Sequence, residues 1–137
     1  MTIDHMSLPV SDLARARHFY DRVLATLGYK RLHDVDVPEY CGSGYGSDAS
    51  GLPEPAFWIG TGNPPAAVTP REGVHVGFAA PDRTAVDAFY QMALTVGGKD
   101  NGRPGLRPHY HEHYYGAFVI DLDGHHIEAC CHHPAAG

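Results

Sequence analysis

The sequence predicts an α+β fold in which two tandem βαβββ repeats form a curved, half-open eight-stranded sheet with the helices outside. Three observations indicate this fold. Residues 5–28 align without a gap to residues 75–98, at a constant offset of 70 residues. Each copy has the pattern of a strand, a turn and an amphipathic helix, and strand signals without helical periodicity follow each helix. One such repeat buries its sheet poorly, so we expect two to pair side by side.

Length and composition fit one globular domain. The 137 residues are 43% apolar and 19% charged, so a single domain over residues 1–137 can bury most of its surface. We expect the two repeats to cover about 1–62 and 73–133, joined by the Pro-rich linker "TGNPPAAVTPREG". The net charge of -6 without a basic run argues against nucleic acid and favours a small-molecule partner. No apolar run approaches the ~20 residues of a membrane span, and no signal peptide precedes the domain, so we expect a cytoplasmic protein.

The first repeat begins with a strand around His5. Ser11 or Asp12 can cap the following helix, which Gly28 ends. Three strands are then predicted at "YKRLHDV", "EYCGSGYG" and "AFWIG", because prolines and glycines interrupt the chain between them.

The second repeat follows the same order. A strand around His75 leads to a helix that Asp82 can cap and Gly97-Gly98 end. "GAFVIDL" and "HHIEACC" are clear strands, joined by a turn at Asp123-Gly124. The intervening "KDNGRPGLRPHYHEHYY" is predicted to be mostly loop, and the terminal "CCHHPAAG" is expected to fray.

Glu128 is unusual because it lies within an apolar strand pattern. A buried carboxylate is costly without a partner, a proton or a metal, although an exposed edge position or a structural salt bridge would also explain it. Strand alternation places His5, His75 and Glu128 each on the polar or small-residue face of its strand, which suits the concave side of a curved sheet. Two imidazoles and one carboxylate form a facial set that leaves about three positions open on an octahedral metal ion.

Three stretches resemble the vicinal oxygen chelate superfamily, which includes glyoxalase I, extradiol dioxygenases and bleomycin-resistance proteins. They are "DHMSLPVSDLARARHFYDRVLATLGY", "GVHVGFAAPDRTAVDAFY" and "YYGAFVIDLDGHHIEACC". The resemblance implies paired βαβββ modules and a divalent metal held by His5, His75 and Glu128. Two histidines and one glutamate favour Fe2+ or Mn2+, while Ni2+, Co2+ and Zn2+ stay possible.

The chain also departs from the patterns of individual families. Glyoxalase I usually has a fourth ligand where the repeat offset places Trp58. We expect Trp58 to line the cavity or stack on a planar substrate. Extradiol dioxygenases usually have a tyrosine where this chain has Phe118, and Tyr114 or Tyr115 can replace it only if the register shifts. Fosfomycin thiol transferases have a small hydroxyl residue two positions after the first ligand, here Ser7, a candidate substrate-binding residue.

A second cluster of polar side chains precedes the penultimate strand. His109, His111, His113 and Tyr115 are candidate catalytic residues because they can exchange protons near the site. Arg107 is a candidate for binding an anionic substrate group. The alternative is a solvated loop without a role in chemistry.

The resemblance implies a metal-dependent enzyme of glyoxalase or extradiol dioxygenase type, that is a lyase, dioxygenase or isomerase. Such an enzyme chelates two neighbouring oxygens of a small substrate on the metal. Two alternatives stay open: a fosfomycin-type thiol transferase, and a metal-free protein of the bleomycin-resistance kind that sequesters its ligand. The superfamily members that this chain resembles are mostly homodimers, so a homodimer is expected.

Overall fold

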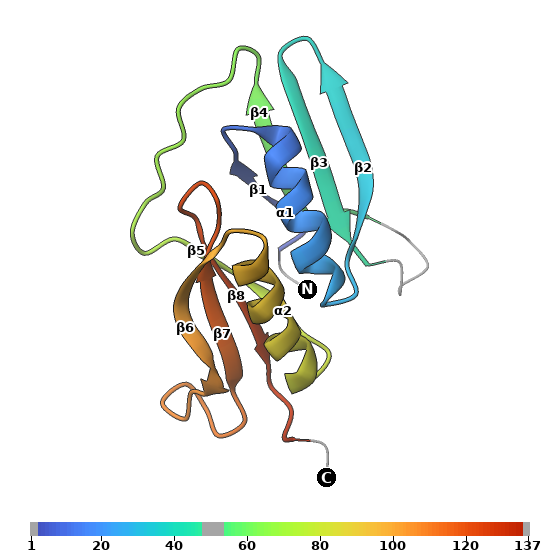
Figure 1. Cartoon of the computed structure of the whole chain (residues 1–137). Helices are drawn as coiled ribbons and strands as arrows, with labels where there is room; N and C mark the ends of the chain where they lie inside the picture. Colours follow the sequence, from blue (N-terminus) through green and yellow to red (C-terminus); the bar gives the residue numbers. More distant parts are fainter. Residues whose placement is uncertain (1–2, 48–53, 136–137) are drawn as a thin grey trace. The chain divides into compact units, whose positions relative to one another are not determined.

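The computed structural model describes residues 3–47 and 54–135, which belong to two compact units, Met1–Thr69 and Pro70–Gly137 (Figure 1). The first unit comprises β1 (Met6–Pro9), α1 (Leu13–Ala25), β2 (Lys30–Val37), β3 (Tyr40–Gly46) and β4 (Phe57–Gly62). The second comprises β5 (His75–Ala79), α2 (Arg83–Thr95), β6 (Lys99–Leu106), β7 (Tyr115–Ile120) and β8 (His126–Cys131). The predicted pair of βαβββ repeats is confirmed, with the eight strands divided between two four-stranded sheets.

Both sheets have the same strand order. The first runs β1-β4-β3-β2 and the second β5-β8-β7-β6, and in each the first strand pairs in parallel with the last. Ser7 lies opposite Trp58 in the first unit, and Gly77 lies opposite Glu128 in the second. The sequence offset of 70 residues therefore holds in the strand register, so Trp58 occupies in its unit the position that Glu128 occupies in the other.

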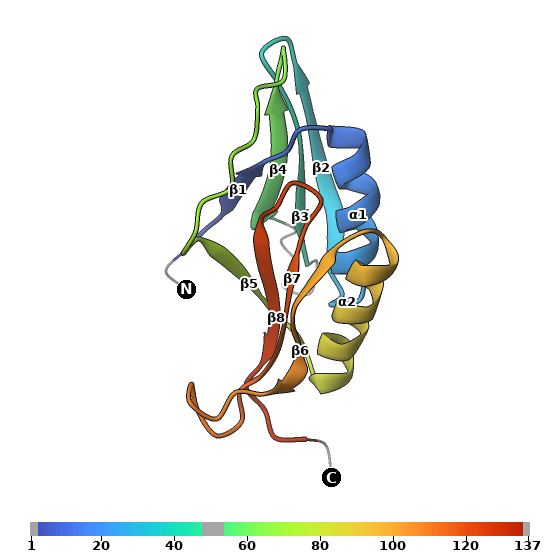
Figure 2. The same cartoon turned by 60° about the vertical axis from the view of Figure 1, so that its left-hand side comes forward.

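Each helix covers one face of its own sheet, as Figure 2 shows for α2 and the strands β5 to β8. Asp12 caps α1 by accepting a hydrogen bond from the Arg15 amide, and Asp82 caps α2 by accepting one from the Ala85 amide. Apolar side chains of both helices pack on the sheets: Phe19, Tyr20, Val23 and Leu24 from α1, and Val86, Phe89 and Ala93 from α2. In the part of the chain that the structure describes, neither helix is long and apolar enough to span a membrane.

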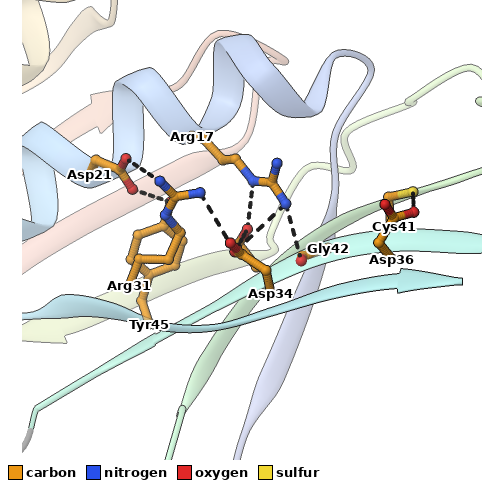
Figure 3. Close-up of polar contacts among 9 residues, drawn as sticks. Arg17, Asp21, Arg31, Asp34, Asp36, Cys41, Gly42 and Tyr45 are labelled. Carbon is orange, nitrogen blue, oxygen red and sulfur yellow. Dashed lines mark hydrogen bonds and ion pairs between the residues drawn. The ribbon is translucent and has the colours of Figure 1, made fainter.

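Polar contacts also hold α1 on the first sheet (Figure 3). The Arg17 guanidinium donates to the Ser43 hydroxyl at 2.7 Å, and that hydroxyl donates to Asp34 on β2 at 2.6 Å. One helical turn further on, the Tyr45 hydroxyl donates to Asp21 at 2.8 Å. These hydrogen bonds join β2 and β3 to the helix at two places, one through Arg17 and one through Asp21.

The predicted loop before β7 is wrong over residues 99–106, which form β6. Two glycines and Pro104 interrupt the pattern of a regular strand in this segment. β6 is the edge strand of its sheet and pairs with β7 through two register shifts, between Asp100 and Gly102 and between Gly102 and Gly105. An edge strand with bulges accommodates these residues because not every backbone amide must donate to a neighbour.

Candidate functional site

The Glu128 carboxylate is buried near the middle of the second sheet. Only 3% of the residue is exposed, and its backbone lies between Gly77 on β5 and Phe118 on β7. Its Oε1 is 3.4 Å from Nε2 of His75, the first residue of β5. Glu128 is thus not at an exposed edge. It is a buried carboxylate with an imidazole beside it.

Tyr114 is the second partner of this carboxylate. Its hydroxyl donates a short hydrogen bond to Glu128 Oε2. Burial, and then the bond to Glu128, raise the pKa of Tyr114 well above its usual range, so the phenol keeps its proton. The two carboxylate oxygens therefore have different neighbours, an imidazole at Oε1 and a phenol at Oε2.

Three aromatic rings surround the Tyr114 ring. Tyr110, His111 and His132 lie edge-on to it, with ring centroids 4.9, 5.4 and 5.1 Å away. The two histidines are joined to each other, because His111 Nε2 is 2.6 Å from His132 Nδ1. The expectation that the terminal segment frays is therefore wrong at His132, which this contact ties to the loop before β7.

Arg107 lies on the same face of the second sheet as Glu128. Its guanidinium carbon is 5.4 Å from the centre of the Phe118 ring, and Phe118 is directly opposite Glu128 in the β7–β8 register. Directly opposed residues point to the same side of a sheet. Arg107 therefore places a cation on this face of the sheet, over Phe118, with one of its Nη atoms donating to the Arg103 carbonyl at 2.7 Å.

Tyr115 points to the opposite face. Its hydroxyl donates to Asp87 on α2 at 2.6 Å, and Arg83 stacks over its ring. Burial, and then the bond to Asp87, raise the pKa of Tyr115 to about 12. Successive strand residues point to opposite faces, so Tyr115 fastens the helix while Tyr114 reaches Glu128.

The three loop histidines differ in their surroundings. His111 contacts Tyr114 and His132, as described above. His109 is exposed, and its ring is tilted against that of Tyr110, with ring centroids 4.3 Å apart. His113 Nε2 is 3.9 Å from an oxygen of Glu112. Of the three candidate catalytic histidines, His111 is the one in contact with the partner of Glu128.

The chain is similar in sequence and in structure to a known family. The family model described as Glyoxalase/Bleomycin resistance protein/Dioxygenase superfamily matches residues 2–129. The chain belongs to this superfamily. No functionally curated protein matches it.

Solved structures of the superfamily share the fold. A glyoxalase/bleomycin resistance protein from Albidiferax ferrireducens T118 is 28% identical over 96% of this chain and 98% of its own, with a TM-score of 0.73. A glyoxylase/bleomycin resistance protein/dioxygenase domain from Frankia sp. EAN1pec is 18% identical over 97% and 98%, with a TM-score of 0.71. Glyoxalase I from Zea mays is 23% identical over 94% of this chain, which spans 45% of that enzyme, with a TM-score of 0.69.

The predicted metal ligands of this superfamily member fall in two units. His75 and Glu128 lie together in the second unit, whereas His5 precedes β1 in the first, where its Nδ1 is 2.5 Å from Asp4. Among residues 3–47 and 54–135, no group of three His, Cys, Asp or Glu side chains is arranged to hold a metal ion. The chemistry of the two adjacent donors, an imidazole and a carboxylate, does fit a divalent ion.

The candidate substrate-binding residues Ser7 and Trp58 lie in the first unit. They face each other across β1 and β4 and so share one side of that sheet. The Trp58 ring lies over Gly44, where an added Cβ would be 2.8 Å from the indole, and its edge contacts the His33 ring. The first unit of this superfamily member therefore has an aromatic side chain where its second unit has a carboxylate.

The sequence did not identify Tyr114 as a partner of Glu128 or His132 as a partner of His111. Tyr114 is expected among the residues that flank the loop histidines and as a possible replacement for Phe118, yet strand alternation contains a more specific signal: Tyr114, Gly116 and Phe118 have the same parity, and Phe118 is opposite Glu128. His132 gave no comparable signal, because its contact with His111 bridges 21 positions of sequence.

Proposed function

We propose that the chain is a metal-dependent enzyme of glyoxalase or extradiol dioxygenase type that acts on a small oxygenated substrate. The observation that carries the proposal is the buried Glu128 carboxylate with the His75 imidazole 3.4 Å from it. Two strands hold these groups rigidly, and an ionised carboxylate at this depth is costly unless a cation or strong donors compensate it. Membership of the superfamily supports the same assignment. His5 is the proposed third ligand.

The bound metal would supply a Lewis acid that chelates neighbouring substrate oxygens and stabilises the negative charge formed there. The chain's own residues have separate tasks. Glu128 contributes the negative ligand charge, while the Tyr114 hydroxyl holds one of its oxygens. Arg107 attracts an anionic substrate group to the same sheet face. His111 is exposed and can exchange a proton with solvent at the rim of this cluster.

Fe2+ and Mn2+ are the metals we favour. Imidazole nitrogen suits late transition metals, and carboxylate oxygen suits harder ions. A set of two histidines and one glutamate therefore favours ions of intermediate hardness. Co2+, Ni2+ and Zn2+ bind similar ligands, and metal availability then decides the occupant.

Metal content and melting temperature test the proposal. Protein purified without chelators or a metal-affinity column should take up about one equivalent of Mn2+ or Fe2+, and its melting temperature should rise because the ion binds the folded state. His75→Ala and Glu128→Gln should each abolish this rise. His133→Ala is the matched control and should keep it, since no described contact joins His133 to Glu128.

A different pattern of melting temperatures is expected if Glu128 does not bind a metal. Glu128→Gln removes a buried charge, which stabilises a protein if no cation is there to compensate the charge. If wild type melts alike with and without metal, and Glu128→Gln melts higher than both, Glu128 is not a ligand and the proposal fails.

A metal-free ligand-sequestering protein is the second candidate. The observation that favours it is in the first unit, where the Trp58 ring lies next to Gly44 and the Tyr40 ring covers Gly60. Aromatic rings on a bare backbone present flat, apolar surface to a planar ligand. Metal uptake below about 0.1 equivalent under all conditions would favour this candidate.

Two broader expectations accompany the proposal. We propose that the protein is a homodimer, as considered further below. We also propose a cytoplasmic location, since Cys41, Cys130 and Cys131 are all free thiols, which a reducing compartment maintains.

A further inference from the structure

We infer that Tyr114 is a positioning residue for Glu128: its hydroxyl holds Oε2 and thereby leaves Oε1 as the ligand oxygen beside His75. This inference rests on the proposed metal site. It goes beyond that site by assigning a role to a residue outside the ligand set, and by stating which carboxylate oxygen faces the metal.

The carboxylate needs such a partner because its terminal torsion is soft. The last side-chain torsion of glutamate is broad and roughly two-fold, so either oxygen can point toward His75 in the absence of other contacts. A phenol hydroxyl on Oε2 breaks this symmetry. With Oε2 engaged, Oε1 at 3.4 Å from His75 Nε2 is the oxygen with free acceptor capacity toward a shared ion.

Tyr114 itself is held on several sides. Its amide donates to the His111 carbonyl at 3.2 Å, and its carbonyl accepts from the Arg107 amide at 2.8 Å. Its ring is enclosed by Tyr110, His111 and His132, of which the last two are bonded to each other. A hydroxyl on so constrained a ring can orient another side chain, which a freely rotating one could not.

Gly116 provides the space for the contact. A Cβ at this position would lie 3.1 Å from both Glu128 Oε2 and the Tyr114 ring, closer than ordinary contacts allow. At Gly77, on the other side of Glu128, a Cβ would lie 3.5 Å from Oε1, which is an ordinary contact. The space around Glu128 is therefore tighter on the side where the phenol meets the carboxylate than on the side of Gly77.

Co2+ binding tests the inference, because the ion reports ligand geometry through its visible absorption spectrum. Tyr114→Phe keeps the ring and removes only the hydroxyl. We expect this variant to bind Co2+ roughly 10–100-fold more weakly than wild type, as is typical when the partner of a metal ligand is lost. Its visible spectrum should also change, since a carboxylate free to use both oxygens alters the coordination.

Tyr110→Phe is the matched control. It removes a hydroxyl from a ring in the same cluster that has no described bond to Glu128, so affinity and spectrum should stay those of wild type. Gly116→Ala is a second probe if Tyr114→Phe folds poorly, because it keeps the phenol but crowds its bond to Glu128, and it should weaken Co2+ binding as well.

The outcomes separate this inference from the proposed function. If wild type binds Co2+ and Tyr114→Phe matches it in affinity and spectrum, the positioning role is wrong while the metal site stands. If wild type takes up no Co2+, Mn2+ or Fe2+, the proposed function and the positioning role fall together.

Discussion

Single glycines decide how the aromatic rings lie on the first sheet. A Cβ at Gly42 would be 2.6 Å from the Tyr40 hydroxyl and 2.8 Å from the Ile59 carbonyl oxygen. The backbone atom cannot rotate away as a side chain can. Gly42 is therefore required by close approach, with no need for an unusual backbone angle.

Gly42→Ala should lower the free energy of unfolding by about 1–3 kcal/mol, the usual cost of inserting a methyl group into a filled space. Gly62→Ala is the matched control on the neighbouring strand, where the nearest atom to a new Cβ is 3.5 Å away. Its effect should stay within about 0.5 kcal/mol. Urea denaturation of the two variants measures the difference, and equal stabilities would contradict the crowding argument.

At the scale of elements, α1 is held by charge as well as by apolar contacts. The Ser43 hydroxyl, which is buried, donates to Asp34, and Arg17 and Arg31 lie 3.6 and 3.5 Å from the same carboxylate oxygen. The Ser43 bond first, and then the two guanidinium groups, hold the pKa of Asp34 below its usual 3.8. Asp34 thus links helix α1 to the hairpin of β2 and β3, in addition to the Tyr45–Asp21 bond (Figure 3).

This contact predicts a pH dependence. Because the pKa of Asp34 is lower in the folded than in the unfolded protein, its stabilisation is complete above pH 3.8 and is lost as the pH falls through the folded pKa. Asp34→Asn should therefore lower the free energy of unfolding at pH 7 by up to about 1 kcal/mol, a small figure because half of the side chain is exposed.

The difference between wild type and Asp34→Asn should shrink as the pH falls below 3.8, which urea denaturation between pH 7 and pH 3 can follow. Asp36→Asn, on the same strand and bonded only to the Cys41 thiol in the described contacts, is the control. A difference for Asp34→Asn that is the same at both ends of this range would contradict the assignment.

On the scale of the whole molecule, the two units share one strand order but differ in the residues on one face of the sheet. Trp58 occupies in the first unit the position that Glu128 occupies in the second, and glycines lie near it. In the described part of each unit, one helix packs on one face of the sheet. Exposed apolar side chains lie on one edge strand of each sheet, Val37 on β2 and Leu106 on β6.

The exposed apolar side chains support the proposed homodimer. Sedimentation at micromolar concentration should give twice the chain mass of 14.9 kDa. Dilution should shift the protein toward the monomer only well below that range. A single species of 14.9 kDa at micromolar concentration would show the expectation to be wrong.

The sequence alone determined the repeat, the two helices and seven of the eight strands. Their signals are local: Asp12 and Asp82 cap helices through amides three residues away, and alternation assigns strand faces two residues at a time. His75 and Glu128 could be assigned to the same site for the same reason, since the alternation of residue types shows which face of each strand is polar.

The tertiary structure alone decided what depends on register and distant contacts. β6 forms because β7 offers it a bulged edge, which composition did not indicate. Tyr114 reaches Glu128 while Tyr115 faces α2, a choice made by one residue of register in the pairing of β7 with β8. His132 joins His111 across 21 positions, and no local preference encodes a contact at that separation.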